Sequence, residues 1–566
     1  MIVISLTNVN LILGSRLILQ NLNWEIQNDQ KIGLIGPNGM GKSSVLKVII
    51  GELFPEPGGT VVRAKGITVG YLPQQIEFDP NEMVEEIALT GNPRYAYIKS
   101  ELDNIEDSIS SPEVYKNPKR LAKALDNQHK LLVEYTALGG DNYPSLVAEI
   151  LRGLGLEKTD FKKPIGLLSS GQRKLVGLAR LLVARPDVML LDEPDNHLDL
   201  QGKAFLESFI AGYPGAIVLV SHDRYLLDAV VTHIADIEDR KLSTFRGDYS
   251  SYMVDKQERL ARQDELFRVQ QKEIARLEAA IKRYAVWAKL YDNEKFANRA
   301  RAIQGRLDRM DKIDRPMLDR KKMGLDLGGW RGSNKVIELT HIRKSFDEKV
   351  ILDNIDLLIF HGERVGLIGI NGSGKTLLLR LIMEAILPEA GEIIIGPSVR
   401  WGYYSQEDEN LDLNRTPVEV IRNTGNLSES NAVSILVRYL FTYEQCQNRI
   451  SELSGGERSR LQLALLMLSG ANFLLLDEPT NNLDIVSTEV LEDALEEFVG
   501  SVLVISHDRY FLDRTVDRIL ELKNGVLEEY VGGYSDYVLK KDLQTSPLVI
   551  NQKSHMGITK LIDGQT

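Results

Sequence analysis

The chain has 566 residues, 43% of them apolar and 26% charged, which is typical of soluble globular material and long enough for several domains. Its formal net charge of −12 argues against a surface that binds nucleic acid everywhere. No run of about 18 apolar residues occurs, so we expect no membrane span, and a membrane role would need another subunit. The one cysteine, Cys446, cannot form an intrachain disulfide, which fits a reducing cytoplasm.

Apolar residues are frequent in residues 1–19, but Asn8, Asn10 and Arg16 interrupt them. Neither a basic leading segment nor a cleavage site made of small residues is evident. We therefore expect a pair of strands there rather than a signal peptide.

Two glycine-rich loops each follow a short apolar run and lead into an apolar segment that we expect to be helical. Such a loop directs backbone N–H groups at phosphate oxygens, its lysine reaches the β- and γ-phosphates, and the next hydroxyl can hold Mg²⁺. The residues expected to bind ATP in this way are Gly36, Pro37, Asn38, Gly39, Met40, Gly41, Lys42, Ser43 and Ser44 in the first copy, and Gly369, Ile370, Asn371, Gly372, Ser373, Gly374, Lys375, Thr376 and Leu377 in the second.

Five further motifs recur in the same order after each loop. The Leu-Ser motif lies 24 residues before the Asp-Glu motif in both copies, and the glutamate lies 29 residues before a histidine in both. The paired stretches are 71–74 with 403–406, 168–172 with 453–457, 190–194 with 475–479, 196–199 with 481–484, and 221–225 with 506–510. A repeat of this length indicates two domains of one α/β fold.

The Asp-Glu motif follows an apolar run in each copy. Residues 473–476 are typical of a buried parallel strand, which would place Asp477 and Glu478 at its carboxyl end, where α/β proteins bind ligands. An exposed turn is the alternative for this motif alone, and a structural role is the usual default for each histidine. The loops and the equal spacings favour a catalytic interpretation.

This ordered set resembles the ATP-binding cassette (ABC) ATPases over residues 1–252 and 335–537. The resemblance implies two cassettes that pair head to tail within one chain, so that each ATP lies between one cassette's glycine loop and the other's signature. The implied signature residues are Ser169, Ser170, Gly171 and Gln172, and Ser454, Gly455, Gly456 and Glu457. The implied Mg²⁺ ligands are Ser43, Gln74 and Asp192, and Thr376, Gln406 and Asp477. The implied catalytic residues are the general bases Glu193 and Glu478 and the switch histidines His222 and His507.

The first copy is longer than the second. Gln74 lies 94 residues before Leu168, whereas Gln406 lies 47 residues before Leu453. The extra residues fall within 82–151, where apolar spacing predicts two short helices, with breaks at Pro112 and Pro118.

Residues 253–322 have a different pattern. Apolar residues seven apart, from Met253 to Ile281 and again from Phe296 to Met317, predict a helical hairpin that reverses at residues 291–294. Residues 256–322 contain 19 Lys or Arg and 11 Asp or Glu, a local charge of +8. Basic residues beside Tyr284, Trp287 and Tyr291 suit RNA phosphates and unstacked bases. The alternative is an inert coiled coil whose aromatic side chains form its seam.

Two fused cassettes, an insertion in the first and a long helical linker resemble the ABC-F proteins. This resemblance implies a cytoplasmic monomer that binds the ribosome in its ATP-closed form, with the hairpin near rRNA and tRNA at the E-site and the insertion on the exit-tRNA side. Hydrolysis would then release it. The sequence does not separate a housekeeping translation factor from an antibiotic-resistance factor. Two alternatives come from other classes: a transporter's ATPase subunit and a DNA-associated ABC ATPase.

Three departures from the repeat predict unequal sites. Ser170 stands where the second signature has Gly455, Asp195 where the second copy has Thr480, and Leu13 where the second copy has Phe346, which can stack on adenine. The segment 541–566 has little periodicity, and we expect it to lack ordered structure.

Overall fold

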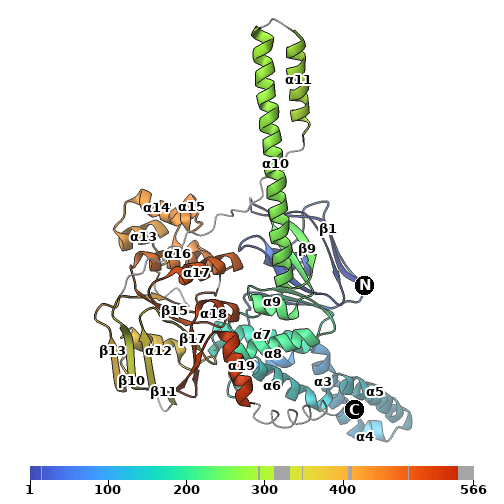
Figure 1. Ribbon diagram of the computed structural model, residues 1–566. Coiled ribbons are helices and arrows are strands. Elements are labelled where there is room, and N and C mark those ends of the chain that lie inside the picture. The colour runs from blue at the N-terminus through green and yellow to red at the C-terminus, as the bar shows by residue number, and fades with distance from the viewer. Residues whose placement is uncertain are drawn as a thin grey trace, which may run out of the picture.

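The computed structural model describes residues 1–14, 16–290, 294–310, 332–346, 349–405, 411–481 and 483–545. They form two α/β domains side by side, with a helical hairpin that projects away from both (Figure 1). Gln406, Asn482, Tyr291 and Met317, which take part in the sequence predictions, lie outside the described residues.

The first domain is built on a six-stranded sheet of order β5-β6-β7-β3-β8-β9, parallel except at the β8–β9 edge. Strands β3, β6 and β7 are buried along their whole length, which explains why their sequences are apolar apart from Lys31 and Asp192 at two of the ends. The strands are β3 (Lys31–Ile35), β5 (Val69–Leu72), β6 (Val188–Asp192), β7 (Ala216–Val220), β8 (His233–Glu238) and β9 (Lys241–Arg246).

The second domain repeats this sheet in the order β14-β15-β16-β12-β17-β18. Residues 473–476 lie in the buried parallel strand β15, as the sequence predicts, and Asp477 ends it. The strands are β12 (Arg364–Ile368), β14 (Trp401–Tyr404), β15 (Phe473–Asp477), β16 (Ser501–Ile505), β17 (Arg518–Lys523) and β18 (Val526–Val531).

Each domain also has a three-stranded antiparallel sheet. Residues 1–19 contribute to its first two strands, as the sequence predicts. The strands are β1 (Ile2–Leu13), β2 (Arg16–Gln27) and β4 (Thr60–Arg63) in the first domain, and β10 (Lys335–Phe346), β11 (Lys349–Phe360) and β13 (Ala390–Ile395) in the second.

Four helices in each domain begin at the repeated motifs. They are α1 (Lys42–Ile50), α7 (Ser170–Ala184), α8 (Leu200–Gly212) and α9 (Arg224–Val230) in the first domain, and α12 (Lys375–Ile382), α16 (Gly455–Leu468), α17 (Ile485–Glu497) and α18 (Arg509–Thr515) in the second. Because each helix starts where a loop motif ends, the motifs lie together at the carboxyl ends of the parallel strands.

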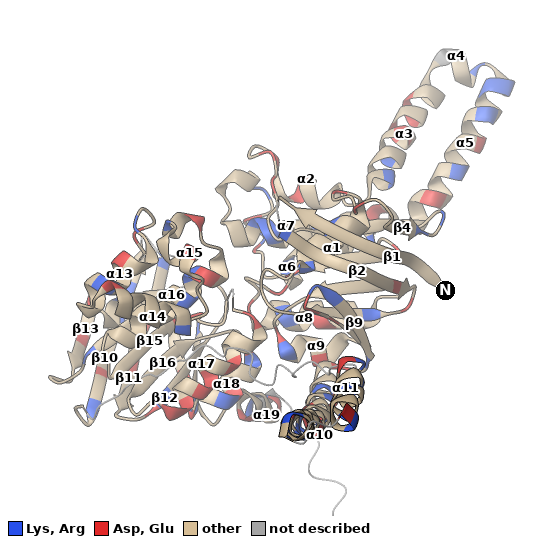
Figure 2. Ribbon diagram, turned by 90° about the horizontal axis from the view of Figure 1, so that it is seen from above, with Lys and Arg blue, Asp and Glu red and all other residues tan. Residues whose placement is uncertain are grey.

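The insertion of the first domain contains two antiparallel helices that extend away from the sheet (Figure 2). Helix α3 ends at Ser110 and α5 begins at Pro118, close to the predicted breaks. An ion pair of 2.7 Å between Arg94 Nε and Glu134 Oε1 joins them. The helices of this region are α2 (Val84–Leu89), α3 (Pro93–Ser110), α4 (Pro112–Tyr115), α5 (Pro118–Ala137) and α6 (Tyr143–Gly153), and those of the second domain are α13 (Pro417–Gly425), α14 (Glu429–Arg438) and α15 (Tyr443–Gln447).

The hairpin consists of α10 (Tyr249–Leu290), a single helix of 42 residues, and α11 (Glu294–Asp308). Near its tip, Tyr284, Trp287 and Phe296 pack on one another across the two helices, with ring centroids 5.7–6.2 Å apart. Tyr284 and Trp287 therefore pack against α11, as the coiled-coil alternative expects, and Trp287 also remains 37% exposed, so its stacking on RNA bases stays a prediction. The basic side chains around them, including Lys282, Lys289 and Arg299, are exposed.

The foot of α10 is fixed to the first domain. Tyr252 and Lys256 both bond Asp236 Oδ2 on β8, at 2.6 and 2.7 Å. In the second domain the final helix α19 (Tyr534–Thr545) occupies the equivalent place, so the hairpin is an extension of a helix that both domains share. Residues 541–545 are helical, which corrects the predicted start of the unstructured tail, and 546–566 lie outside the described residues.

Candidate functional site

The glycine loops have backbone shapes that other residues would not tolerate. Gly41 and Gly374, which precede α1 and α12, have φ values of 92° and 102°. A Cβ atom on Gly36 would lie 2.6 Å from the Ile237 carbonyl oxygen, and one on Gly369 would lie 2.5 Å from that of Leu522. Both loops are therefore compact turns whose N–H groups lie at a helix N-terminus, an arrangement that binds phosphate.

The loop lysines are buried and bond to their own loops. Lys42 Nζ donates to the Gly36 carbonyl at 2.7 Å, and Lys375 Nζ donates to the Gly369 carbonyl at 2.8 Å. Burial lowers the pKa of both lysines, while nearby carboxylates such as Glu193 and Glu478 oppose the shift. Each Nζ thus lies over its own loop, where an ammonium group can neutralise a phosphate.

The aspartates that end β6 and β15 fit a magnesium ion. Both carboxylate oxygens of Asp192 are buried, and burial raises its pKa, while the Ser43 hydroxyl beside it opposes that shift. Asp477 Oδ2 accepts a hydrogen bond of 2.8 Å from the Thr376 hydroxyl. The described residues contain no group of three or more His, Cys, Asp or Glu that could enclose a metal. One carboxylate beside a phosphate loop is the usual Mg²⁺ environment.

The glutamates after these aspartates have strained backbones. Glu193 has a φ of 51° and Glu478 one of 49°, a left-handed conformation that costs about 1–3 kcal/mol for a residue with a side chain. The Glu193 amide bonds the Val220 carbonyl and the Glu478 amide bonds that of Ile505, both at 2.9 Å. The next strand therefore maintains the strained turn and keeps each carboxylate in place.

Each of these glutamates faces a histidine. His507 Nε2 lies 3.4 Å from Glu478 Oε1, and His222 Nε2 lies 3.9 Å from Glu193 Oε1. Gln74 adds a hydrogen bond of 3.0 Å to Glu193 Oε2, which joins three predicted site residues of the first copy.

Burial changes the protonation of these groups. It raises the pKa of Glu478 to about 7 and lowers that of His507 well below its usual value. It also lowers the pKa of His222 to about 4. The two histidines are therefore neutral near pH 7, and Glu478 is suited to accept a proton.

The signature motifs form the N-termini of α7 and α16. The Ser169 hydroxyl accepts from the Gln172 amide and the Gln172 side chain bonds back, and Ser454 and Glu457 do the same in the second copy. Ser170 does not disturb this capping box, because the hydroxyl that caps α7 belongs to Ser169.

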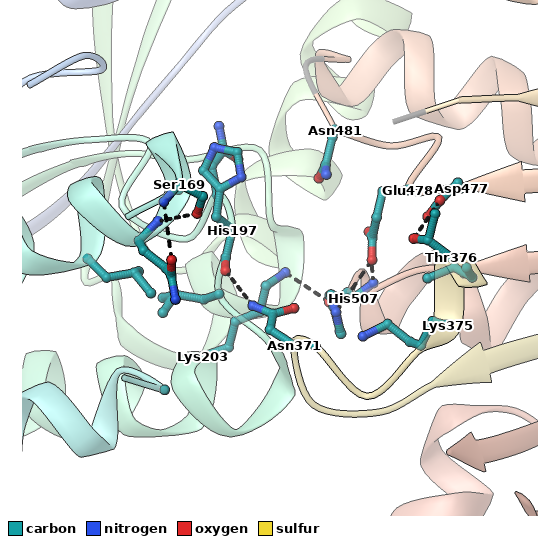
Figure 3. Close-up of a pocket in the computed structure, with 18 of the residues that line it drawn as sticks. Ser169, His197, Lys203, Asn371, Lys375, Thr376, Asp477, Glu478, Asn481 and His507 are labelled. Carbon is teal, nitrogen blue, oxygen red and sulfur yellow. Dashed lines mark hydrogen bonds and ion pairs between the residues drawn. The ribbon is translucent and has the colours of Figure 1, made fainter. Parts of the chain in front are cut away.

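A cavity of about 960 Å³ separates the first signature from the second glycine loop. Figure 3 shows Ser169 and His197 of the first domain opposite Lys375, Thr376 and Glu478 of the second. Its lining includes Ser169, Ser170, Gly171, Gln172, Asn371, Gly372, Gly374, Lys375, Thr376, Leu377, Asp477, Glu478, His507 and Phe346. One site is thus built from both domains.

Direct contacts between the domains are reciprocal. Asp199 Oδ2 accepts from the Asn371 amide at 3.2 Å, and Asp484 Oδ2 accepts from the Asn38 amide at 3.1 Å. Both aspartates end the repeated Asn-x-Leu-Asp motif. Each therefore contacts the glycine loop of the other domain.

The arginine and tyrosine of the repeated Ser-His-Asp-Arg-Tyr motif lie at the contact between the domains. Arg224 forms a buried ion pair with Glu492 of α17, and its guanidinium lies 4.3 Å from the ring centroid of Tyr510. In return, Arg509 forms an ion pair with Glu207 of α8 and lies 4.1 Å from the ring centroid of Tyr225.

No role for these arginines and tyrosines follows from the sequence alone, although the motif that contains them recurs in both copies. The recurrence of the arginine and the tyrosine in both copies is the feature of the sequence that could have indicated a role for them. Since each arginine pairs with the other domain, the repeated motif supports the contact between the domains as well as the nearby histidine.

Comparisons with known proteins agree with this architecture. A family model described as ABC transporter matches residues 19–196 and 352–481, and a second model of that description matches 235–326. ABC transporter F family member 5 of Arabidopsis thaliana is 31% identical over 95% of this chain and 77% of its own. The chain is an ABC-F member of the ATP-binding cassette family.

Other relatives of this ABC-F chain are bacterial. The putative ATP-binding protein YdiF of Bacillus subtilis is 34% identical, over 99% of this chain and 86% of its own length. The energy-dependent translational throttle protein EttA of Escherichia coli K12 is 33% identical over 92% of each chain.

Among solved structures, this chain is similar to the archaeal ribosome recycling factor aABCE1 in its complex with stalk protein aP1. The TM-score is 0.61 and the sequence identity 18%, over 94% of this chain and 92% of that one. This likeness shows the fold of two paired cassettes. No described helix of the ABC-F chain is long and apolar enough to cross a membrane.

Proposed function

We propose that this ABC-F protein hydrolyses ATP at two sites between its cassettes, binds the ribosome when the cassettes are closed on ATP, and leaves it after hydrolysis. The observation that carries this proposal is the reciprocal contact of Asp199 with Asn371 and of Asp484 with Asn38. Because each glycine loop is completed by the other cassette, nucleotide binding and cassette closure are coupled within one chain.

At each site the loop lysine and the N–H groups hold the phosphates, and Asp192 or Asp477 holds Mg²⁺ together with Ser43 or Thr376. Mg²⁺ supplies charge neutralisation at the phosphates. Glu193 and Glu478 orient the attacking water and accept its proton, for which a pKa of about 7 suits Glu478.

The ribosome is the proposed partner for two reasons. A relative of similar length, EttA, is named a translational throttle. In addition, the hairpin extends far from both cassettes (Figure 1), and its basic side chains, such as Lys289 and Arg299, are exposed, which suits a contact with RNA phosphates. We further propose a monomer acting in the cytoplasm, with the hairpin near rRNA and tRNA at the E-site.

Co-sedimentation with ribosomes tests the proposal. Changing Glu193→Gln and Glu478→Gln together removes the base with little change of shape, so ATP should remain clamped and ribosome binding should persist with ATP but not with ADP. Wild type should bind briefly with ATP. Hydrolysis by the double variant at the wild-type rate contradicts the assignment, and stimulation by DNA rather than by ribosomes favours the DNA-associated alternative.

A further inference from the structure

One buried lysine connects the histidine loops of the two cassettes. Lys203 lies on α8 and is 6% exposed. Its Nζ donates to Asp223 Oδ2 of its own cassette and to the His507 carbonyl of the other cassette, both at 2.8 Å (Figure 3). Lys203 therefore reaches the backbone of the histidine that faces Glu478.

Lys203 remains charged in this position. Burial acts to lower its pKa, but Asp223, Asp195 and Asp508 outweigh burial, so the pKa lies above its usual value. The same positive charge opposes the upward shift in the pKa of Glu478. Lys203 is thus a cation beside the second site's base and histidine, although it belongs to the first cassette.

The first site has a buried lysine of a different kind: Lys174 donates to the Glu193 carbonyl at 2.7 Å, but it belongs to the same cassette as Glu193 and does not bridge the two. The repeat aligns Lys203 with Thr488 and Asp195, one of the carboxylates that raise the pKa of Lys203, with Thr480, so both of these buried charged residues are replaced by threonine in the second cassette. The ion-pair partner of Lys203 is Asp223, and the second cassette keeps an aspartate, Asp508, at the position of Asp223. The bridge therefore acts on only one of the two His-Glu pairs.

We propose that Lys203 is a positioning residue that holds His507 and Glu478 in their hydrolytic arrangement when the first cassette closes on the second, and thereby makes hydrolysis at the Lys375 site the faster of the two. This inference rests on the proposed hydrolysis of ATP at both sites. A bridge to a backbone carbonyl transmits closure directly, because the loop that carries His507 gains this contact only while α8 lies against it.

The experiment compares the two sites separately in the full chain. Glu193→Gln leaves Glu478 as the active base, and Glu478→Gln leaves Glu193. Into each background we introduce Asp195→Thr with Lys203→Thr, which copies the residues of the second cassette, and Asp223 keeps Arg509, 4.0 Å away, as a cationic neighbour. The measured quantity is the kcat in the Glu193→Gln background divided by the kcat in the Glu478→Gln background. This ratio should fall about 10- to 100-fold, because small displacements of catalytic groups have effects of that size. The KM for ATP at the Lys375 site should change less than about twofold, since the residues of its glycine loop are unaltered.

A second variant separates positioning from simple support of the interface. Adding Thr480→Asp and Thr488→Lys moves the pair to the other cassette, and the ratio of the two turnovers should then invert. Equal loss at both sites, or an unchanged ratio in the transplanted variant, overturns the proposal. If wild type hydrolyses ATP but neither Glu193→Gln nor Glu478→Gln alone does, the two sites do not act separately, and this proposal is overturned. If wild type itself does not hydrolyse ATP, the result contradicts the proposed function instead.

Discussion

The carboxylate of Asp199 accepts a hydrogen bond of 3.2 Å from the backbone amide of Asn371, in the glycine loop of the other cassette. The other oxygen of Asp199 caps α8 through the Gly202 amide at 2.9 Å. One side chain thus fixes the start of a helix and contacts the opposite phosphate loop. Any change in that loop is therefore transmitted to α8 and to the residues it carries.

Asp199→Asn should weaken ATP binding at the Lys375 site. The amide can still cap α8, but the loop loses a charged acceptor, at a cost of about 1.5 kcal/mol, or roughly tenfold in affinity. Titration of a fluorescent ATP analogue in a Lys42→Ala background, where only the Lys375 site binds, measures the effect. Asp484→Asn in the same background is the matched control, because Asp484 contacts the disabled loop. Equal weakening by both substitutions contradicts this prediction.

The interface ion pairs should differ in their effect on stability. The side chain of Glu492 is fully buried and faces Arg224 and Arg514, whereas that of Glu207 is 17% exposed. Glu492→Gln leaves buried positive charge without its partner, which costs about 3 kcal/mol and lowers the Tm by roughly 5 °C or more. Glu207→Gln should lower the Tm by less than half as much. Thermal unfolding of both variants side by side checks the order, and a larger effect of Glu207→Gln contradicts it.

The sequence predicted the parts of the site whose chemistry is local. A glycine loop between a strand and a helix, or a carboxylate at the end of an apolar run, needs only neighbouring residues, and the structure places these elements where the sequence indicates. The ion pair of Arg224 with Glu492 joins residues 268 positions apart, and the pair of Arg509 with Glu207 joins residues 302 apart. Such contacts depend on how two rigid domains meet, which no periodicity along the chain encodes.

The hairpin illustrates the same limit. Sevenfold spacing predicted two antiparallel helices, and α10 and α11 are present, with α10 extended to Tyr249–Leu290. The spacing did not show which aromatic residues face the partner helix, because Trp287 lies off the sevenfold series. Only the packing of Trp287 on Phe296 places it in the seam.

Phe346→Leu should reduce ATP affinity at the Lys375 site. Phe346 lines the cavity and is 50% exposed, so its ring can stack on adenine, whereas Leu13 of the first cassette offers only apolar contact. Loss of an aromatic stack costs about 1 kcal/mol, or roughly fivefold in affinity. The titration is made in the Lys42→Ala background. Leu13→Phe in a Lys375→Ala background is the reciprocal variant and should tighten binding, and no change in either variant argues against stacking.

Reversal of the hairpin's charges should weaken ribosome binding and flatten its dependence on salt. Lys289, Lys295 and Arg299 are exposed near the tip, and changing all three to Glu removes cations that neutralise RNA phosphates. Arg283 is left in place because its guanidinium lies 5.6 Å from the ring centroids of Tyr284 and Trp287 and supports the seam. If all three cations contact phosphate, the slope of log K against log salt should fall by roughly 2 units.

The matched control for this reversal is Lys241→Glu with Lys349→Glu and Lys523→Glu, three exposed lysines on strands of the cassettes. It makes the same change in net charge away from the hairpin, so it should alter ribosome binding much less. Hydrolysis without ribosomes should stay near normal in both variants, because no loop or signature residue is touched. Co-sedimentation across a salt series measures the slopes. If the hairpin variant binds ribosomes as tightly as its control at every salt concentration, the hairpin makes no phosphate contacts and serves only to space the two cassettes.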